Sequence, residues 1–241
     1  SLSHTLEYAY TDWCLGQLMS SLGKKKEAAE YEKRAKAYRN VWCDSVQWFR
    51  ARVKGGGWLP WRGRTAQDQG TTESNPFQQG WFVPHDIDGM KALMGGQKKF
   101  DAELEEFFAN VPEDFLWNDY YNHPNEPNHH VPFLFNYSSC PWLTQKWTRK
   151  ICDKAYGDDV LGLCGNEDVG QMSAWYVLAA MGIHPICPGN PRYEITSPVF
   201  ESVEIKLDTH FYSGKNFKII AHNNSPQNIY IQSVSLNGKK L

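Results

Sequence analysis

Residues 85–109 read HDIDGMKALMGGQKKFDAELEEFFA, and this stretch is the most informative about the fold. Its first half has helical spacing up to Met94, and two glycines then end the helix. Its second half places four large apolar side chains on one helical face, namely Phe100, Leu104, Phe107 and Phe108. Two helices separated by two glycines predict an antiparallel helix hairpin.

The same pattern recurs on both sides of this stretch. Helical spacing covers residues 3–21 and 28–42, which predicts a second hairpin. A third pair is expected at residues 129–137 and 142–156, and a last helix at residues 169–181, where Met172, Trp175, Tyr176 and Ala179 share one face. Helices arranged in hairpins predict a mainly α fold of the toroid or solenoid type.

After Pro185 the apolar pattern changes from helical to alternating. Residues 203–207, 217–221 and 230–236 alternate in polarity, which predicts a small antiparallel β region. Asn237-Gly238 is a strong hairpin signal, but only three residues follow it, too few for a full return strand. Because the number of predicted helices is also odd, we expect a piece of a longer protein.

The composition excludes some partners and favours others. The chain has 25 Lys and Arg against 27 Asp and Glu, with no long run of either sign, so nucleic acid is not expected as a partner. No apolar stretch reaches the ~18 residues of a membrane span. The 10 Trp and 12 Tyr suit platforms for flat ligands such as sugars. The 6 Cys form no C-x-x-C pair and do not decide the compartment.

Four loops between the predicted helices combine polar and aromatic residues, and they are the candidates for a functional site. They read TTESNPFQQGWFVPHD (71–86), HPNEPNHH (123–130), PWLTQ (141–145) and GNEDVGQMSAW (165–175). In a helical toroid, loops of this kind gather at one end, so we expect these four segments to meet.

In this order, the four loops resemble glycoside hydrolase family 92, the calcium-dependent exo-acting α-mannosidases. The resemblance runs from TLEYAY (5–10) to Asn237-Gly238. In that family an amino-terminal β-sandwich precedes an (α/α)6 toroid, and the last strands return to the sandwich. The resemblance therefore implies that residues 1–188 form the second half of a catalytic (α/α)6 toroid, a partial toroid. It also implies that residues 189–241 form strands that pack on a missing N-terminal β-sandwich.

The resemblance assigns the two catalytic carboxylates. Glu73 occupies the position of the family's general acid, in a T-E-G-N-like motif, and Asp168 that of the general base, the last Asp of a G-N/D-D/E-D-x-G motif. Inversion needs one protonated carboxyl for the leaving oxygen and one ionised carboxylate for water, roughly 6.5–9.5 Å apart. From the residues alone, Asp168 is equally well explained as a helix cap, because it directly precedes a helix.

The resemblance also implies a bound Ca²⁺ ion and sugar contacts beside these carboxylates. Asn125 and Glu126 match the family's N-E-P segment, which lies next to mannose and calcium. Substrate contacts are expected from Asn125, Glu126, Asn166 and His85. Calcium ligands are expected from Glu126, Asn166 and Asp168, because this hard cation prefers oxygen.

A zinc site is the alternative metal interpretation. His129-His130 is followed by Cys140, Cys152 and Cys164, and such residues bind zinc in some proteins. Their spacing matches no standard zinc pattern, so helix packing is the favoured interpretation.

We therefore expect an exo-acting α-mannosidase that removes terminal α-linked mannose, with α-1,2 preference, from oligosaccharides or glycoproteins with inversion. Its partners would be a mannose-containing glycan and the missing N-terminal domain of the same protein. Family analogy implies an extracytoplasmic location. Two alternatives stay open: a non-catalytic fragment or carbohydrate-binding toroid, and a toroid hydrolase specific for another sugar.

Overall fold

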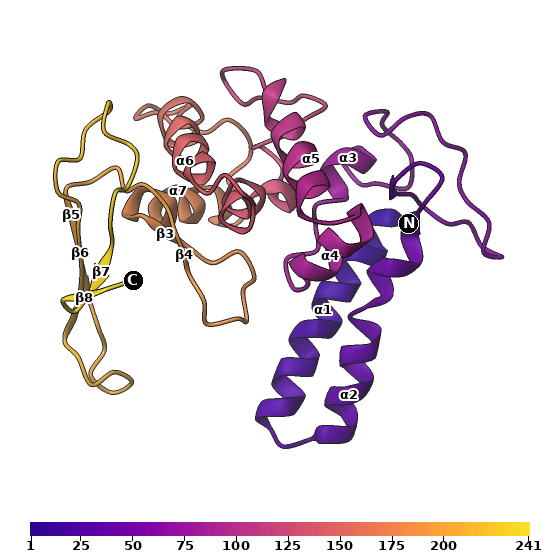
Figure 1. Ribbon diagram of the computed structural model, residues 1–241, viewed down its shortest axis with the longest axis horizontal. Coiled ribbons are helices and arrows are strands. Elements are labelled where there is room, and N and C mark those ends of the chain that lie inside the picture. Colours follow the sequence, from indigo (N-terminus) through magenta and orange to yellow (C-terminus); the bar gives the residue numbers. More distant parts are fainter.

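The computed structural model describes all residues, 1–241, and its elements follow one another along the long axis (Figure 1). The α-helices are α1 (Leu2–Ser21), α2 (Lys25–Arg34), α3 (Pro76–Gln79), α4 (Ile87–Met94), α5 (Gln97–Ala109), α6 (Trp142–Lys154) and α7 (Gln171–Met181). Three 3₁₀ helices are η1 (Ala37–Val41), η2 (Glu126–Asn128) and η3 (Val131–Tyr137). The prediction of a mainly helical fold is confirmed.

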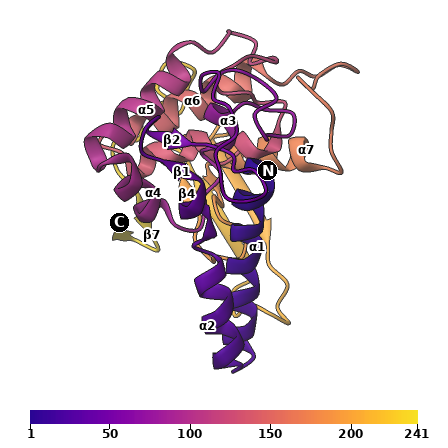
Figure 2. The same cartoon turned by 90° about the vertical axis from the view of Figure 1, so that its right-hand side faces the viewer.

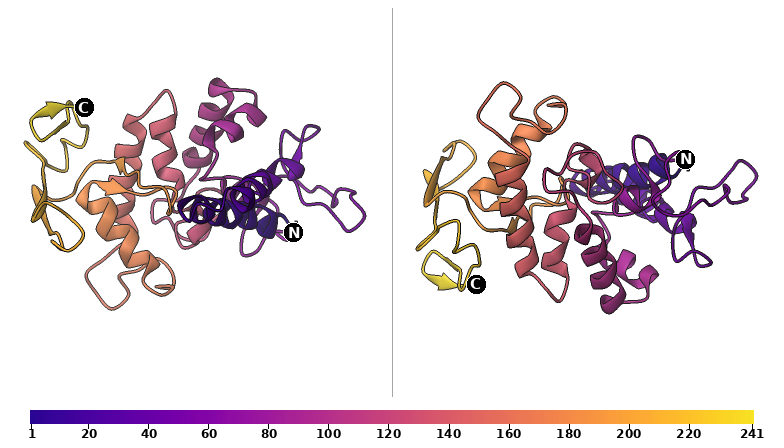
Figure 3. Two further views of the ribbon diagram at one scale, coloured as in Figure 1. Left: turned by 90° about the horizontal axis from the view of Figure 1, so that it is seen from below. Right: turned by 90° about the horizontal axis from the view of Figure 1, so that it is seen from above.

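The strands form four separate antiparallel pairs. These pairs are β1 (Trp42–Cys43) with β2 (Trp48–Phe49), β3 (Ile183–His184) with β4 (Glu194–Ile195), β5 (Ser202–Lys206) with β6 (Asn216–Ile220), and β7 (Ser235–Leu236) with β8 (Lys239–Lys240). The pairs β5–β8 lie together at one end of the molecule, as the views from below and above show (Figure 3). The predicted small antiparallel β region is therefore present.

Helices α1 and α2 form an antiparallel hairpin that projects from the body of the molecule (Figures 1 and 2). The reversal between them falls at Gly23, whose φ is 73°, a value that glycine adopts easily. The helix predicted over residues 28–42 ends earlier, at Arg34. It is followed by η1, and Trp42 then pairs with Phe49 as a strand, which buries both rings.

The predicted hairpin of residues 85–109 is confirmed as α4 and α5. Gly95 and Gly96 have φ of 94° and 106°, which reverses the chain between the helices. Phe100, Leu104 and Phe107 are completely buried. The apolar face read from the sequence is therefore the face that packs into the core.

An aromatic cluster fixes α3 against α5. The ring centroid of Trp48 lies 5.2 Å from that of Phe77, and the Phe77 centroid lies 4.9 Å from that of Phe107, both at steep interplanar angles. Trp48 Nε1 also donates to the Pro76 carbonyl at 2.6 Å. A Cβ at Gly80 would lie 2.5 Å from that nitrogen, so only glycine fits there.

The carboxyl-terminal part differs from the sequence expectation in detail. Residues predicted as a helix over 129–137 form the 3₁₀ helix η3, with Pro132 near its start. Helices α6 and α7 end within two residues of their predicted ends. Asn237 and Gly238, with φ of 51° and 77°, close the β7–β8 hairpin although the return strand has only two residues.

None of the helices combines the length and the apolarity needed to cross a bilayer.

Candidate active site

Glu73 lies in an irregular turn directly before α3. Its φ is 51°, in the left-handed region, and its side chain is exposed. The next two residues are buried, and Asn75 caps α3 by accepting from Gln78 N at 2.9 Å while Gln78 Oε1 accepts from Asn75 N at 3.1 Å. The cap fixes the chain on one side of Glu73, so the carboxylate projects from an anchored turn.

Asn125 is the residue before η2, and Glu126 is the first residue of this 3₁₀ helix. Asn125 is buried, and its Nδ2 donates to the Glu73 carbonyl oxygen at 3.0 Å, which joins the two loops. The pKa of Glu126 is raised to about 7, first by burial and then by a hydrogen-bonding contact with Asp168 and by the charges of Asp168 and Glu73. The charges of both Asp168 and Glu73 therefore act on the carboxyl of Glu126.

Asp168 lies two residues before the cap of α7. Asp168, Val169 and Gly170 have φ of 48°, 58° and 92°, so the chain makes a left-handed approach to the helix. The N-cap residue is Gly170, and no side chain accepts a capping hydrogen bond there. The helix-cap interpretation of Asp168 is therefore wrong.

The carboxylate that serves the first turn of α7 is that of Glu167. Its Oε1 accepts from Ser173 N at 3.2 Å, and its Oε2 accepts from Ser173 Oγ at 2.8 Å. Asp168 is exposed and has no such local partner. Its carboxylate is accessible near the amino end of α7, where a negative charge is favoured by the helix dipole.

The structure thus brings together three of the residues predicted for the site. Glu73, Glu126 and Asp168 come from three loops that lie far apart in the sequence. Asn125 ties the first two loops together. Burial makes the ionisation of Glu126 unfavourable, and the neighbouring charges of Asp168 and Glu73 add to this effect.

A layer of buried histidines supports these loops from behind. His129 Nδ1 accepts from Gln171 Nε2 at 3.1 Å, and His129 Nε2 donates to the His123 carbonyl at 2.9 Å. His123 Nδ1 accepts from the Tyr121 hydroxyl at 2.7 Å, and His123 Nε2 donates to the Tyr156 hydroxyl at 2.7 Å. Burial lowers the pKa of His129 to about 4, so the layer is neutral.

No metal cluster of the kind that binds zinc is formed. No three His, Cys, Asp or Glu side chains are arranged to hold a metal ion. His129 and His130 are bound to backbone carbonyls, and Cys152 is buried in the core. The packing interpretation of these residues is the one that the structure supports.

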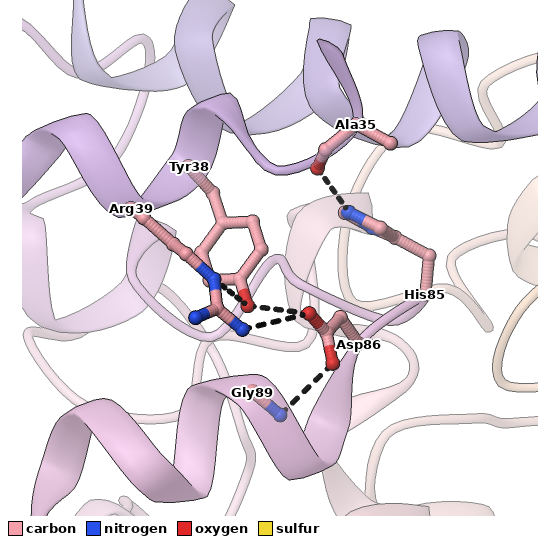
Figure 4. A network of polar contacts seen from close by, with 6 residues as sticks. All are labelled: Ala35, Tyr38, Arg39, His85, Asp86 and Gly89. Atoms are coloured by element: carbon pink, nitrogen blue, oxygen red, sulfur yellow. Dashed lines mark hydrogen bonds and ion pairs between the residues drawn. The ribbon is translucent and has the colours of Figure 1, made fainter. Parts of the chain in front are cut away.

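His85 makes its contacts in another part of the molecule. Its Nε2 donates to the Ala35 carbonyl at 2.9 Å, beside a network in which the Tyr38 hydroxyl donates to Asp86 at 2.6 Å (Figure 4). Burial lowers the pKa of His85, and its Nδ1 has no protein partner. A substrate contact from His85 stays a prediction.

Asn166 is exposed beside Asp168 and has no hydrogen bond from its side chain within the protein.

A cavity of about 430 Å³, which the sequence did not predict, lies beside Glu73. Its other walls come from the segment before Glu73, from α3 and from the segment after α5, and comprise Gln67, Gln78, Trp117, Asn118, Asp119 and Asn122. The Trp-Asn-Asp sequence at residues 117–119 joins an aromatic to polar side chains, and this signal indicates a site as the four loops did.

A larger groove, of about 1240 Å³, lies between α6, α7 and the loop that leads to the last strands. None of Glu73, Glu126 and Asp168 lines it. Size alone therefore does not identify the reactive site, and the converging carboxylates do.

Accessible carboxylates on separate loops of a helical scaffold form the type of site used by carboxylate-dependent glycosidases. The model of the glycosyl hydrolase family 92 catalytic domain matches residues 1–241. The chain therefore belongs to glycosyl hydrolase family 92.

Solved structures show the same fold. The family GH92 α-mannosidase BT3965 from Bacteroides thetaiotaomicron superposes with a TM-score of 0.92 at 36% identity, covering 100% of this chain and 32% of that one. The family GH92 inverting mannosidase BT2199 from Bacteroides thetaiotaomicron VPI-5482 gives a TM-score of 0.89 at 34% identity, covering 100% and 34%.

A curated relative from Arthroderma benhamiae is described as an uncharacterized secreted glycosidase. It is 31% identical over 263 residues, which cover 100% of this chain and 33% of the relative. The chain thus spans about a third of the length of the proteins that it matches.

Proposed function

We propose that this chain supplies the two catalytic carboxylates of an inverting exo-α-mannosidase, with Glu73 as general acid and Asp168 as general base. The observation that carries the proposal is the gathering of Glu73, Glu126 and Asp168 from separate segments: burial raises the pKa of Glu126 to about 7, and the neighbouring Asp168 and Glu73 add to that rise. Membership of family 92 and the similarity to an inverting mannosidase support it.

In the proposed reaction each carboxylate moves one proton. Protonated Glu73 gives its proton to the glycosidic oxygen as the bond to the anomeric carbon breaks. Ionised Asp168 removes a proton from a water molecule that attacks the same carbon from the opposite face. Asp168 suits this role because its carboxylate is exposed and is not needed to cap α7.

The residues at the site are compatible with a calcium ion. Glu126 and Asp168 are in contact, and their mutual repulsion is the kind of charge that a divalent cation neutralises. Asn166 adds an amide oxygen two residues before Asp168. We propose Glu126, Asn166 and Asp168 as calcium ligands, with Asn125 orienting the Glu73 loop through the hydrogen bond to its carbonyl. A bound calcium would supply a positive charge that holds vicinal sugar hydroxyls.

The proposal includes the finer features of the enzyme. The substrate is a terminal α-linked mannose with α-1,2 preference, and the compartment is extracytoplasmic, which the secreted relative supports. Residues 1–188 form the second half of an (α/α)6 toroid. Residues 189–241 pack on a β-sandwich outside this chain, and the exposure of apolar strand residues such as Ile220 (54%) and Leu236 (47%) supports that packing.

The test uses the full-length protein that contains this chain, with calcium and an α-1,2-linked mannobioside. Glu73→Gln and Asp168→Asn are each expected to lower kcat by at least about 10³-fold, because each removes one proton transfer. Glu204→Gln, on exposed strand β5, is the matched carboxylate control and should leave kcat unchanged. Wild-type activity in Glu73→Gln would overturn the assignment, and retention of the product anomer by NMR would overturn inversion.

A second candidate, a chain that binds sugar without turnover, is favoured by its coverage of only about a third of its relatives. It predicts that this chain alone binds α-mannosides without hydrolysing them. Turnover by the chain alone would exclude it, and a panel of aryl glycosides would reveal specificity for another sugar.

A further inference from the structure

The turn that carries Glu73 (residues 70–75) is anchored on its amino-terminal side to the start of α1, far away in the sequence. The Gly70 carbonyl accepts from Leu2 N at 2.6 Å and from Ser3 N at 3.3 Å, two N–H groups that a helix leaves without partners in its first turn. Thr72 N donates to Ser3 Oγ at 2.9 Å. The residues just before Glu73 are therefore fixed by α1 and not by local structure alone.

A buried amide, that of Gln79 in α3, joins this anchor to the carboxyl-terminal side of the turn. Its Oε1 accepts from Ser3 Oγ at 2.9 Å and from Ser74 Oγ at 3.2 Å, and its Nε2 donates to Glu7 Oε1 at 3.4 Å. Ser3, Ser74 and Gln79 are 1%, 2% and 0% exposed. The Ser3 hydroxyl thus accepts a hydrogen bond from the Thr72 N–H and donates its own proton to Gln79, so it links the two sides of the turn.

Glu73 itself has a backbone conformation that needs such anchors. Its φ of 51° lies in the left-handed region, which is unfavourable for a residue with a Cβ. A residue of this kind persists only where its surroundings determine the chain around it. The Glu73 carbonyl accepts from Asn125 Nδ2 at 3.0 Å, and its two neighbours in the sequence are held by Ser3 and Gln79. Without these hydrogen bonds the turn would relax and its carboxylate would change direction.

The chemistry of this network indicates a positioning role and not packing alone. A core needs no hydroxyl or amide for its stability, and a buried polar group adds a cost unless it is hydrogen-bonded. Buried groups that are hydrogen-bonded to one another restrict the chain to one arrangement. Here the restricted segment is the one with the exposed carboxylate of Glu73, whereas Ser3 and Gln79 are too deeply buried to touch a substrate.

We propose that Ser3 and Gln79 are positioning residues for the general acid, which hold the backbone of the Glu73 turn so that the carboxyl meets the glycosidic oxygen. The inference rests on the proposed function, because this positioning matters only if Glu73 donates the proton. Proton transfer needs a donor within hydrogen-bond distance, so a small displacement of the carboxyl slows the reaction. Ser3 and Gln79 act through Glu73 alone.

The experiment varies the need for a proton on the leaving group, in the full-length protein with calcium. A mannobioside needs the general acid, because a sugar alkoxide is a poor leaving group. Dinitrophenyl α-mannoside does not, because its phenolate leaves without a proton. Ser3→Ala is expected to lower kcat on the mannobioside at least about tenfold and to change kcat on the dinitrophenyl mannoside less than about threefold.

Two further variants test the same network. Ser74→Ala removes one of the two hydroxyls that donate to Gln79 and leaves the Thr72 N–H bonded, so it should show the same selectivity with a smaller loss. Gln79→Met keeps a similar volume without the amide and should resemble Ser3→Ala. Ser197→Ala, the matched control, removes a similarly buried hydroxyl in the segment after β4 and should leave both substrates unaffected.

Equal losses on both substrates in Ser3→Ala, as a merely structural role would give, or no loss on either, would overturn the inference. If Ser3→Ala does not fold, Ser74→Ala decides by the same comparison. Failure of the proposed function looks different, because Glu73→Gln would then retain full activity on the mannobioside. If Glu73→Gln loses that activity while Ser3→Ala and Ser74→Ala match the wild type, only the positioning inference fails.

Discussion

His130 is a buried neutral histidine, and replacing it with glutamine should reduce the acid sensitivity of the fold. Its Nε2 donates to the Trp81 carbonyl at 2.9 Å, and the side chain is only slightly exposed. Burial, aided by His129, lowers its pKa from 6.5 to about 4. Because the folded pKa lies below the unfolded value, the stability that His130 provides is present above pH 6.5 and is lost as the pH falls towards 4.

The magnitude follows from the two pKa values. Between pH 7 and pH 5 the unfolded histidine takes up most of a proton and the folded one almost none, which lowers the free energy of unfolding by about 2 kcal/mol. Full titration would cost about 3 kcal/mol. His130→Gln retains a side-chain N–H that can donate to the Trp81 carbonyl but does not titrate, so this part of the loss should disappear.

The assay is urea unfolding of wild type and His130→Gln at pH 7 and pH 5, followed by tryptophan fluorescence. The difference between the two proteins in this pH-dependent loss of stability isolates the contribution of His130, because Glu126 titrates in both proteins. The pKa of Glu126 is raised, so its protonation stabilises the fold as the pH falls, which has the opposite sign. An equal loss of stability in both proteins, within about 0.5 kcal/mol, would refute the reasoning.

Two further substitutions test the backbone. A Cβ at Gly89 would lie 2.2 Å from the Tyr38 hydroxyl and 2.3 Å from Asp86 Oδ2, so Gly89→Ala should break the cap of α4 and lower the free energy of unfolding by about 2–4 kcal/mol. The control is Gly57→Ala, whose Cβ would meet only the Val53 Cγ2 methyl, at 3.4 Å. Val169 has a φ of 58°, so Val169→Gly should relieve strain and raise the stability by about 0.5–1 kcal/mol; an unchanged or lower melting temperature would contradict this.

The helix hairpins were predictable where local signals agreed with packing. In residues 85–109 the apolar spacing and the two glycines indicate the same two helices, and the structure has them, with Asp86 capping the first. The helix expected to reach Trp42 ends at Arg34, because Trp42 pairs with Phe49 instead. That pairing depends on contacts with residues outside the stretch of helical spacing, and the spacing of apolar residues carries no information about such contacts.

The site was predictable only in part, for a related reason. Glu73, Glu126 and Asp168 were identified through the resemblance to the family, and their proximity depends on long-range contacts such as that between Asn125 and Glu73. Trp117 lay in none of the four loops singled out in the sequence. Its loop is held near Glu73 by hydrogen bonds from Asn75 and Gln78, and a sequence pattern does not reveal these long-range contacts of a short helix.

The segment before α7 shows why the local chemistry of Asp168 was ambiguous. Either of two adjacent acids, Glu167 and Asp168, could serve the helix start, and a sequence pattern does not separate them. The left-handed conformations of Asp168 and Val169 shift the cap to Gly170 and turn Glu167 towards Ser173. Since Glu167 satisfies the first turn, the carboxylate of Asp168 contributes no capping bond and is accessible beside Glu126. A turn with left-handed residues at this point therefore leaves the carboxylate of Asp168 free of the helix start, as the proposed role of general base requires, and backbone strain of this kind tends to occur at functional sites.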